Sequence, residues 1–161
     1  MRRKGAETVI LYYKAIPGMK KLLLQEQDML EEEYDGLRGT AYDGMPHSAQ
    51  PGNPTAMLAA KVADQKVYER LQEIKIRLQV LEGDAAAIRG VLDDLNSKYK
   101  SLVFMKLLYD YSWPKISAKL SAPDSTVRYW YKLALNAAAK GLDDLAMPDE
   151  LLERASRARG L

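Results

Sequence analysis

One apolar stripe constrains the fold of this 161-residue chain more than any other feature. Between residues 67 and 95, apolar side chains follow one another at spacings of four and three residues in alternation. This spacing keeps them on one face of a long α-helix and is typical of coiled coils. We therefore expect an all-α protein that contains a long, coiled-coil-like helix over residues 55–97. The stripe consists of Val67, Leu71, Ile74, Leu78, Leu81, Ala85, Ile88, Leu92 and Leu95.

Two glycines, Gly83 and Gly90, lie within this predicted helix. Each lowers the helical propensity by roughly 1 kcal/mol relative to alanine. The apolar spacing keeps its phase across both of them, which favours one unbroken helix. If it is unbroken, residues 55–95 would extend over roughly 60 Å at about 1.5 Å per residue. A break at Gly83, with Asp84 capping a second helix, is the alternative.

A helix of this length needs a partner for its apolar stripe, because so small a chain cannot cover it completely. We favour the same helix from a second chain, since heptads this regular commonly mark coiled coils. The chain is then a homo-oligomer, with a dimer favoured. The alternative is an antiparallel pair within one chain, formed with residues 18–37. In the favoured interpretation, the long helix, residues 55–97, is the candidate oligomerisation region.

Residues 1–37 form the predicted N-terminal helical region. We expect Pro17 and Gly18 to divide it into a short helix and a longer one. Apolar residues would share one face of the longer helix, although Glu26 falls on that same face. Residues 38–54 contain three Gly and three Pro without periodicity, which predicts a linker or extended loop. The residues expected on the apolar face are Leu22, Leu23, Met29, Leu30 and Tyr34.

The composition offers little material for catalysis. The chain has no cysteine, which excludes disulfides, thiolate zinc sites and a cysteine nucleophile. Its one histidine, His47, lies in the predicted linker, and we interpret it as a solvated loop residue. The acidic run from Glu31 to Glu33 is more typical of a solvated helix face than of a metal site. We expect no catalytic residue, no metal and no cofactor, and hence no enzyme.

The sequence also argues against a membrane location. No apolar run approaches the roughly 18 residues that a membrane span needs. The chain starts with basic and then apolar residues, MRRKGAETVILYY. However, the apolar part is short, Lys14 interrupts it and no small-residue cleavage site follows, so a secretory signal is not expected. We expect a cytoplasmic protein without membrane contact.

Positive charge is concentrated in one segment. Residues 98–140 hold eight Lys and Arg against two Asp, whereas the formal net charge of the whole chain is only +2. The same segment includes residues 120–135, LSAPDSTVRYWYKLAL, in which aromatic and cationic side chains follow a Ser/Ala/Pro/Asp turn. A localised cationic surface of this kind favours an anionic partner.

Residues 98–141 predict three helices. The first, residues 98–109, is apolar. The second, residues 113–120, begins after Ser112, which is a good N-cap, and has proline in its first turn. The third, residues 124–139, is longer and basic.

The last two of these helices are joined by a short turn, and the second is the longer and more basic. This is the pattern of a helix-turn-helix, which inserts its second helix into the major groove of DNA. Gly141 is expected to stop that helix. Residues 142–161 are expected to form a C-terminal tail.

The spacing predicts which side chains of the module face inward and which face outward. Arg128 can reach the two acceptors on a guanine edge. Lys115, Lys119 and Lys132 suit phosphates, which fix the register without reading sequence. A three-helix protein-interaction module with a basic face is the alternative. The predicted inner contacts are Ile116, Leu120, Val127 and Trp130, and the residues on or beside the outward face are Ser125, Thr126, Arg128, Tyr129 and Lys132.

Residues 100–135 resemble region 4 of bacterial sigma factors. In that family an apolar helix precedes a short helix of the form W/Y-x-x-I-A-x-x-L, a G-x-S-x-S-T-V turn and a basic helix that ends in A-L. Residues 18–140 are more loosely similar to phage-encoded late transcription regulators of the ArpU and RinA type, which have Y-S-W before the first motif helix. The residues that match the sigma pattern are Trp113, Ile116, Leu120, Ser125, Thr126, Val127, Arg128, Ala134 and Leu135.

The resemblance implies sequence-specific binding to double-stranded DNA at a phage or prophage promoter. The chain would then activate late genes in the cytoplasm of a bacterial host cell. Two positions of the turn depart from the family. Ser121 stands where glycine is usual, and Pro123 stands where a capping Ser or Thr is usual. Ser121 and Asp124 are expected to form a substitute cap.

Two other functions use the same features. A small terminase-like DNA-packaging subunit also joins a helix-turn-helix to helical oligomerisation segments, although often in the opposite order. An adaptor could instead bind RNA polymerase through the basic helix. Direct contact with RNA polymerase is open in the first interpretation as well.

Overall fold

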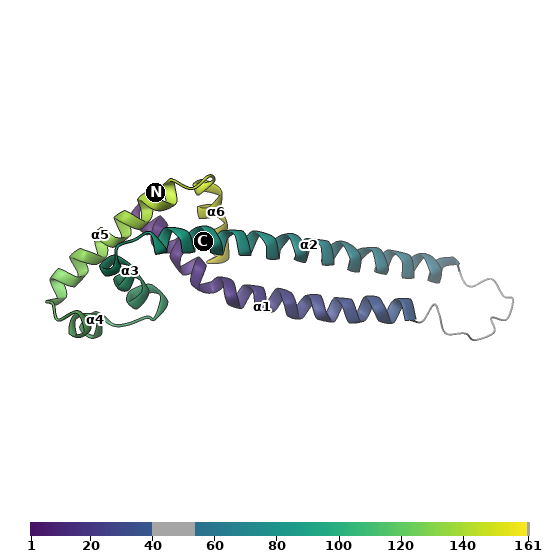
Figure 1. Cartoon of the computed structure of the whole chain (residues 1–161). Helices are drawn as coiled ribbons and strands as arrows, with labels where there is room; N and C mark the ends of the chain where they lie inside the picture. Colours follow the sequence, from purple (N-terminus) through teal and green to yellow (C-terminus); the bar gives the residue numbers. More distant parts are fainter. Residues whose placement is uncertain (40–53, 161) are drawn as a thin grey trace. The chain divides into compact units, whose positions relative to one another are not determined.

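The computed structural model describes residues 1–39 and 54–160, and their regular secondary structure is entirely helical (Figure 1). The predicted all-α fold class is confirmed. Most of the predicted linker, residues 40–53 with His47, lies outside the described residues. The elements are α1 (Arg3–Gly39), α2 (Pro54–Asp93), α3 (Ser97–Val103), the π-helical segment η1 (Phe104–Leu108), α4 (Trp113–Leu120), α5 (Asp124–Asp143) and α6 (Pro148–Ala158).

The chain forms two units, and both long helices contribute to each of them. The first unit comprises Met1–Pro17 and Glu82–Leu161, and the second comprises Gly18–Leu81. This division differs from the predicted segments because the start of α1 and the end of α2 join the C-terminal half of the chain.

In the second unit, the stripe of α2 packs against α1, and the two helices run side by side in opposite directions (Figure 1). Val67, Ile74 and Leu81 are buried. Arg70 Nε donates to Glu26 Oε1 at 2.6 Å, and Arg70 Nη2 donates to Glu26 Oε2 at 2.9 Å. The stripe is therefore covered within one chain, as the antiparallel alternative expects. Pairing with the same helix of a second chain is not needed to cover it, and self-association stays a prediction.

The predicted inner face of α1 is confirmed for some of its residues and wrong for two of them. Leu22 and Met29 were expected to be inside, but 68% and 70% of their surfaces are exposed. Leu23, Leu30 and Tyr34 are half-buried, as predicted, and so is Glu26 on the same face. Because neighbouring residues on a helix point about 100° apart, a face built on Leu23 and Leu30 turns the preceding residues outward. The two hydrogen bonds from Arg70 lower the pKa of Glu26, so this inner carboxylate stays charged.

Helix α1 continues through Pro17, so the predicted break at Pro17 and Gly18 is wrong. Proline lacks the backbone N–H and crowds the preceding turn, which costs about 3 kcal/mol in a helix interior. The turns before Pro17 bury Ile10, Tyr12 and Ile16 almost completely. We infer that this packing outweighs the local cost. The boundary between the two units nevertheless falls directly after Pro17.

Helix α2 is unbroken across Gly83 and Gly90, which confirms the favoured interpretation of its spacing. Asp84 therefore caps no second helix. It lies in the middle of α2, where only 6% of its surface is exposed. A β-carbon at Gly83 or Gly90 would meet no atom within 4 Å beyond its chain neighbours and the backbone of its own helix.

Gly141 lies inside α5 rather than at its end, because α5 continues to Asp143. The predicted stop at Gly141 is therefore wrong. A β-carbon on Gly141 would lie 2.8 Å from Val91 Cγ1. The glycine thus allows α5 to approach α2 closely, and packing rather than helix termination explains it.

Replacing Gly141 with alanine should lower the free energy of unfolding by about 1–3 kcal/mol, because Val91 is β-branched and cannot rotate freely away. Gly90→Ala is the matched control, since it adds the same methyl group in a helix without a clash. It should raise the free energy of unfolding by about 0.5–1 kcal/mol. Urea unfolding followed by circular dichroism measures both. Equal effects of the two variants would contradict the close approach.

The predicted C-terminal tail contains a further helix, α6. Its first turn carries a proline and two acidic residues, Asp149 and Glu150, all favourable at a helix start. Leu151 and Ala155, four residues apart, are buried. These local signals were present in the sequence, and the interpretation of residues 142–161 as a tail missed them.

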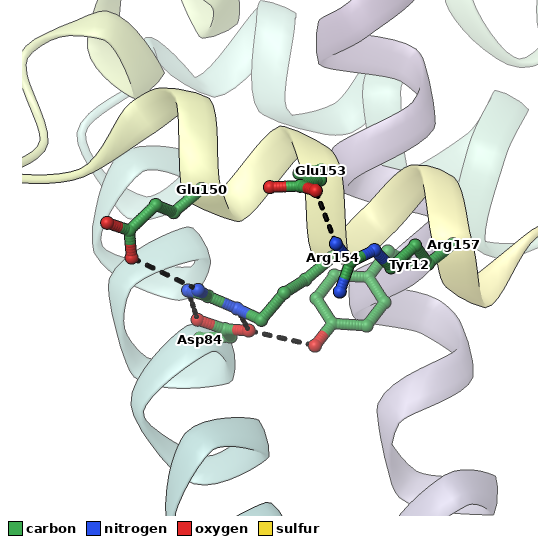
Figure 2. A network of polar contacts seen from close by, with 6 residues as sticks. All are labelled: Tyr12, Asp84, Glu150, Glu153, Arg154 and Arg157. Atoms are coloured by element: carbon green, nitrogen blue, oxygen red, sulfur yellow. Dashed lines mark hydrogen bonds and ion pairs between the residues drawn. The ribbon is translucent and has the colours of Figure 1, made fainter.

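A buried carboxylate, Asp84, connects three helices of the first unit (Figure 2). From α6, Arg154 Nε and Nη2 donate to the two Asp84 oxygens at 2.9 and 2.7 Å. From α1, the Tyr12 hydroxyl donates to Asp84 Oδ2 at 2.8 Å. Burial and the Asp84 hydrogen bond raise the pKa of Tyr12, so its hydroxyl remains a donor. The hydrogen bonds to Asp84 likewise raise the pKa of Arg154.

Replacing Arg154 with leucine should lower the free energy of unfolding by about 2–4 kcal/mol, because it leaves Asp84 buried without its cation. Arg157→Leu is the matched control on the same helix, since Arg157 pairs with the exposed Glu153 (Figure 2). Its effect should stay within about 0.5 kcal/mol. Urea unfolding gives the stability, and hydrogen exchange of α6 backbone amides shows whether that helix is released first. Similar losses for both variants would contradict the role given to Asp84.

Candidate nucleic-acid interface

The segment that carries the positive charge is held together by a small apolar core. Leu102 of α3, Ile116 of α4 and Val127 of α5 are fully buried in it. Among the predicted inner contacts, Ile116 and Val127 are thus confirmed, and Leu120 and Trp130 are partly buried against the same core. The other partly buried residues around it are Met105, Tyr111, Trp113 and Ala122.

Helix α4 has the predicted bounds, and local chemistry explains both ends. The Ser112 hydroxyl accepts a hydrogen bond from the backbone N–H of Lys115 at 3.4 Å, and Pro114 lies in the first turn. At the other end, Ser121 adopts the left-handed conformation with φ 51° and ψ 43°. Ser121 thus takes up the backbone geometry for which glycine is usual.

The turn between α4 and α5 is closed differently from the expectation. The Ser117 hydroxyl donates to the carbonyl oxygen of Ala122, which links α4 to the turn. The predicted cap by Ser121 and Asp124 does not form, because the N-cap residue is Pro123 and no side chain caps the helix. Asp124 is instead the first residue of α5, where its carboxylate binds Arg128.

Helix α5 has one buried side and one exposed side. Val127, Tyr131, Ala134, Leu135 and Ala138 are buried at helical spacing. The predicted outward residues Ser125, Arg128, Tyr129 and Lys132 are exposed, and Thr126 is half-buried. On α4, Lys115 and Lys119 are exposed as well.

Several cations of this segment lie on aromatic rings. Lys115 and Lys119 have their ammonium groups 3.8 and 5.5 Å from the centroid of the Tyr111 ring. Lys106 is 4.6 Å from the Trp113 ring. Such contacts hold a cation by the electron-rich ring face without neutralising its charge. The sequence reasoning missed Lys106 and Tyr111, although the alternation of Lys with Tyr and Trp was visible.

Lys98 is another cation that was not predicted. Its ammonium group lies 3.2 Å from the centroid of the Trp130 ring. Lys98 begins the basic segment at α3, whereas Trp130 belongs to α5. The contact covers the partly buried indole and leaves a cation beside α5.

Tyr131 differs from its aromatic neighbours because it points inward. Its hydroxyl donates to Glu7 Oε1 of α1 at 3.0 Å, and its ring meets Trp113 edge-on at 5.2 Å between centroids. Burial, followed by the nearby Glu7, raises the pKa of Tyr131. Tyr131 is therefore part of the core, while Tyr129, two residues earlier, is 60% exposed.

Replacing Ser121 with glycine should raise the free energy of unfolding by about 0.5–1 kcal/mol, because glycine adopts the left-handed conformation without a steric cost. Ser125→Gly is the control, since Ser125 lies in the right-handed first turn of α5. That variant should lower the stability by about 0.5 kcal/mol. Thermal unfolding distinguishes the two signs. A loss of stability in Ser121→Gly would contradict the left-handed turn.

Other kinds of site were not found in the part of the chain that the structure describes. Within residues 1–39 and 54–160, no three His, Asp or Glu side chains gather as metal ligands would. None of the helices there combines the length and the apolar character that crossing a membrane requires. Comparisons of the chain with protein-family models, curated proteins and solved structures found no match.

Proposed function

We propose that this chain is a sequence-specific DNA-binding transcription regulator in which α4 and α5 act as a helix-turn-helix. The observation that carries the proposal is the division of α5 into two sides. Apolar residues from Val127 onward are buried, while Ser125, Arg128, Tyr129 and Lys132 are exposed together. A helix held in this way can insert its exposed side into a major groove, which is wide enough for one helix.

The exposed side chains have complementary roles in this proposal. Arg128 donates to the O6 and N7 atoms of a guanine, the commonest specific contact in protein–DNA complexes. Ser125 and Thr126 are short hydroxyl residues at the start of α5, where they approach bases or phosphates closely. Tyr129 is the exposed aromatic residue of the same side.

The lysines supply the contacts that do not depend on sequence. Lys115 and Lys119 on α4, together with Lys132 on α5, bind backbone phosphates and fix the register of the module. Their neutralisation of phosphates releases counterions, which makes the affinity depend steeply on salt. The excess of cations in residues 98–140 supports this role.

The biological setting follows from the resemblance to sigma region 4 and to phage late regulators. We propose that the chain activates late genes of a phage or prophage. A homodimer would bring two modules onto one DNA site and raise the affinity through effective concentration. Contact with RNA polymerase would follow from activation at a promoter.

Replacing Arg128 with alanine should weaken binding to the preferred DNA site by roughly 1–3 kcal/mol. Arg157→Ala is the matched control, since Arg157 is also exposed and also pairs with an acidic residue four positions earlier. It should leave the affinity unchanged. Footprinting of DNA near the gene finds the site, and fluorescence anisotropy measures the affinities.

Salt dependence separates the roles of the cations. The logarithm of the binding constant should fall linearly with the logarithm of salt concentration, by about 0.9 per phosphate neutralised. Lys132→Ala should reduce that slope by about 1 and weaken binding to all sequences alike. A wild-type protein that binds every duplex equally would refute the proposed function.

A further inference from the structure

Arg128 is held from two directions in the free protein. Its Nε donates to Asp124 Oδ2 at 2.8 Å, one helical turn earlier on α5. Its guanidinium carbon lies 5.2 Å from the centroid of the Trp113 ring on α4. Trp113 is fixed in turn by the edge-on contact with the buried Tyr131. A long side chain that could sample many rotamers is thus restrained by a carboxylate and by an aromatic ring.

The restraint leaves the useful edge of the guanidinium open. Asp124 occupies Nε, and among the described residues the Arg128 side chain makes no second hydrogen bond. The edge formed by Nη1 and Nη2 therefore keeps its donors. This edge presents two parallel N–H groups, the arrangement that matches the O6 and N7 acceptors of guanine.

The pair between Asp124 and Arg128 contributes little to folding. The side chains of Arg128 and Asp124 are 55% and 46% exposed, and solvent screens exposed pairs of this kind strongly. The contrast within the molecule is the pair between Arg154 and Asp84, in which the Asp84 side chain is only 8% exposed.

Asp124 also opposes the electrostatics of the surface around it. It is the only acidic residue between residues 111 and 142, a stretch otherwise rich in lysine. A carboxylate at this place repels phosphates and weakens binding to DNA of any sequence. The presence of Asp124 is explained if its carboxylate holds Arg128 and does not itself contact DNA.

We propose that Asp124 is a positioning residue that orients Arg128 for guanine, so that it raises base discrimination while it lowers overall affinity. This inference rests on the proposed DNA-binding function and assigns the specificity of that surface. Trp113 provides the aromatic ring over which the guanidinium carbon lies. Because the orientation exists before binding, less side-chain freedom is lost when guanine is contacted.

The proposal predicts two effects of opposite sign for Asp124→Ala. Discrimination for guanine at the Arg128 contact should fall by about three- to tenfold, as expected when a rotamer-rich side chain must be ordered on binding. Binding to random DNA should become tighter, because one negative charge has left the surface. Asp144→Ala is the matched control, since Asp144 is exposed at the other end of α5. It removes the same charge and should leave the discrimination unchanged.

The experiment uses the full chain and a pool of DNA duplexes with a randomised segment. Bound duplexes are sequenced for the wild type, Asp124→Ala, Arg128→Ala, the double variant and Asp144→Ala. The position that loses its guanine preference in Arg128→Ala identifies the contact. Asp124→Ala should weaken the preference at that position, and should have no further effect on it when Arg128 is already alanine. Asp124→Asn, which keeps the shape of the side chain, should give a smaller loss, and thermal unfolding verifies that each variant is folded.

Two other kinds of result would overturn the positioning role of Asp124. If the Asp124→Ala variant binds DNA more tightly but keeps the guanine preference, the positioning role is refuted while the DNA-binding function stands. The same conclusion follows if Asp124→Ala lowers the guanine preference by the same factor when residue 128 is already alanine. If the wild type enriches no sequence from the pool, the proposed function and this inference fail together.

Discussion

Packing of the buried side of α5 fixes which of its side chains are exposed, and those exposed side chains make up the candidate interface. Near its start, Val127 is fixed by the core that includes Leu102 and Ile116. Near its end, Gly141 lets the helix backbone approach Val91 of α2. Because α5 is held at both ends, it cannot rotate about its axis, and a rotation by one residue would turn each side chain by about 100°. Ser125, Arg128 and Lys132 share one side for this reason.

Two carboxylate–arginine pairs of the first unit show how burial decides what such a pair does. Asp84 is buried and receives hydrogen bonds from Arg154 and Tyr12, so the loss of one partner leaves a desolvated charge. Asp124 and Arg128 share a single hydrogen bond, and solvent reaches both side chains. Water can replace either partner there at little cost. The first pair therefore ties α6 to α2. The second pair contributes little to stability and instead orients the Arg128 side chain.

Sequence reasoning succeeded where local rules and packing agree. The α2 stripe, the Ser112 cap and the bounds of α4 follow from spacing and capping. It failed where distant contacts override local preference. Pro17 and Gly141 carry strong stop signals, yet both lie inside helices whose neighbours are well packed. Of the candidate site, the exposed face of α5 could be predicted from the helical period. The contact of Lys98 with Trp130 could not, because it joins α3 to α5, whose proximity depends on the tertiary fold. Lys115 lies only four residues from Tyr111, so that contact is local in the sequence.

The α2 stripe also limits how two chains could associate. Its first part, including Ile74 and Leu81, belongs to the second unit, and its later part, including Ile88 and Leu92, belongs to the first. These four residues are already buried within one chain. A coiled coil between two copies along this stripe would have to separate α2 from α1 and break the two hydrogen bonds between Arg70 and Glu26. A dimer that leaves each chain folded must therefore use a different surface, and the regular heptads are explained by pairing within the chain.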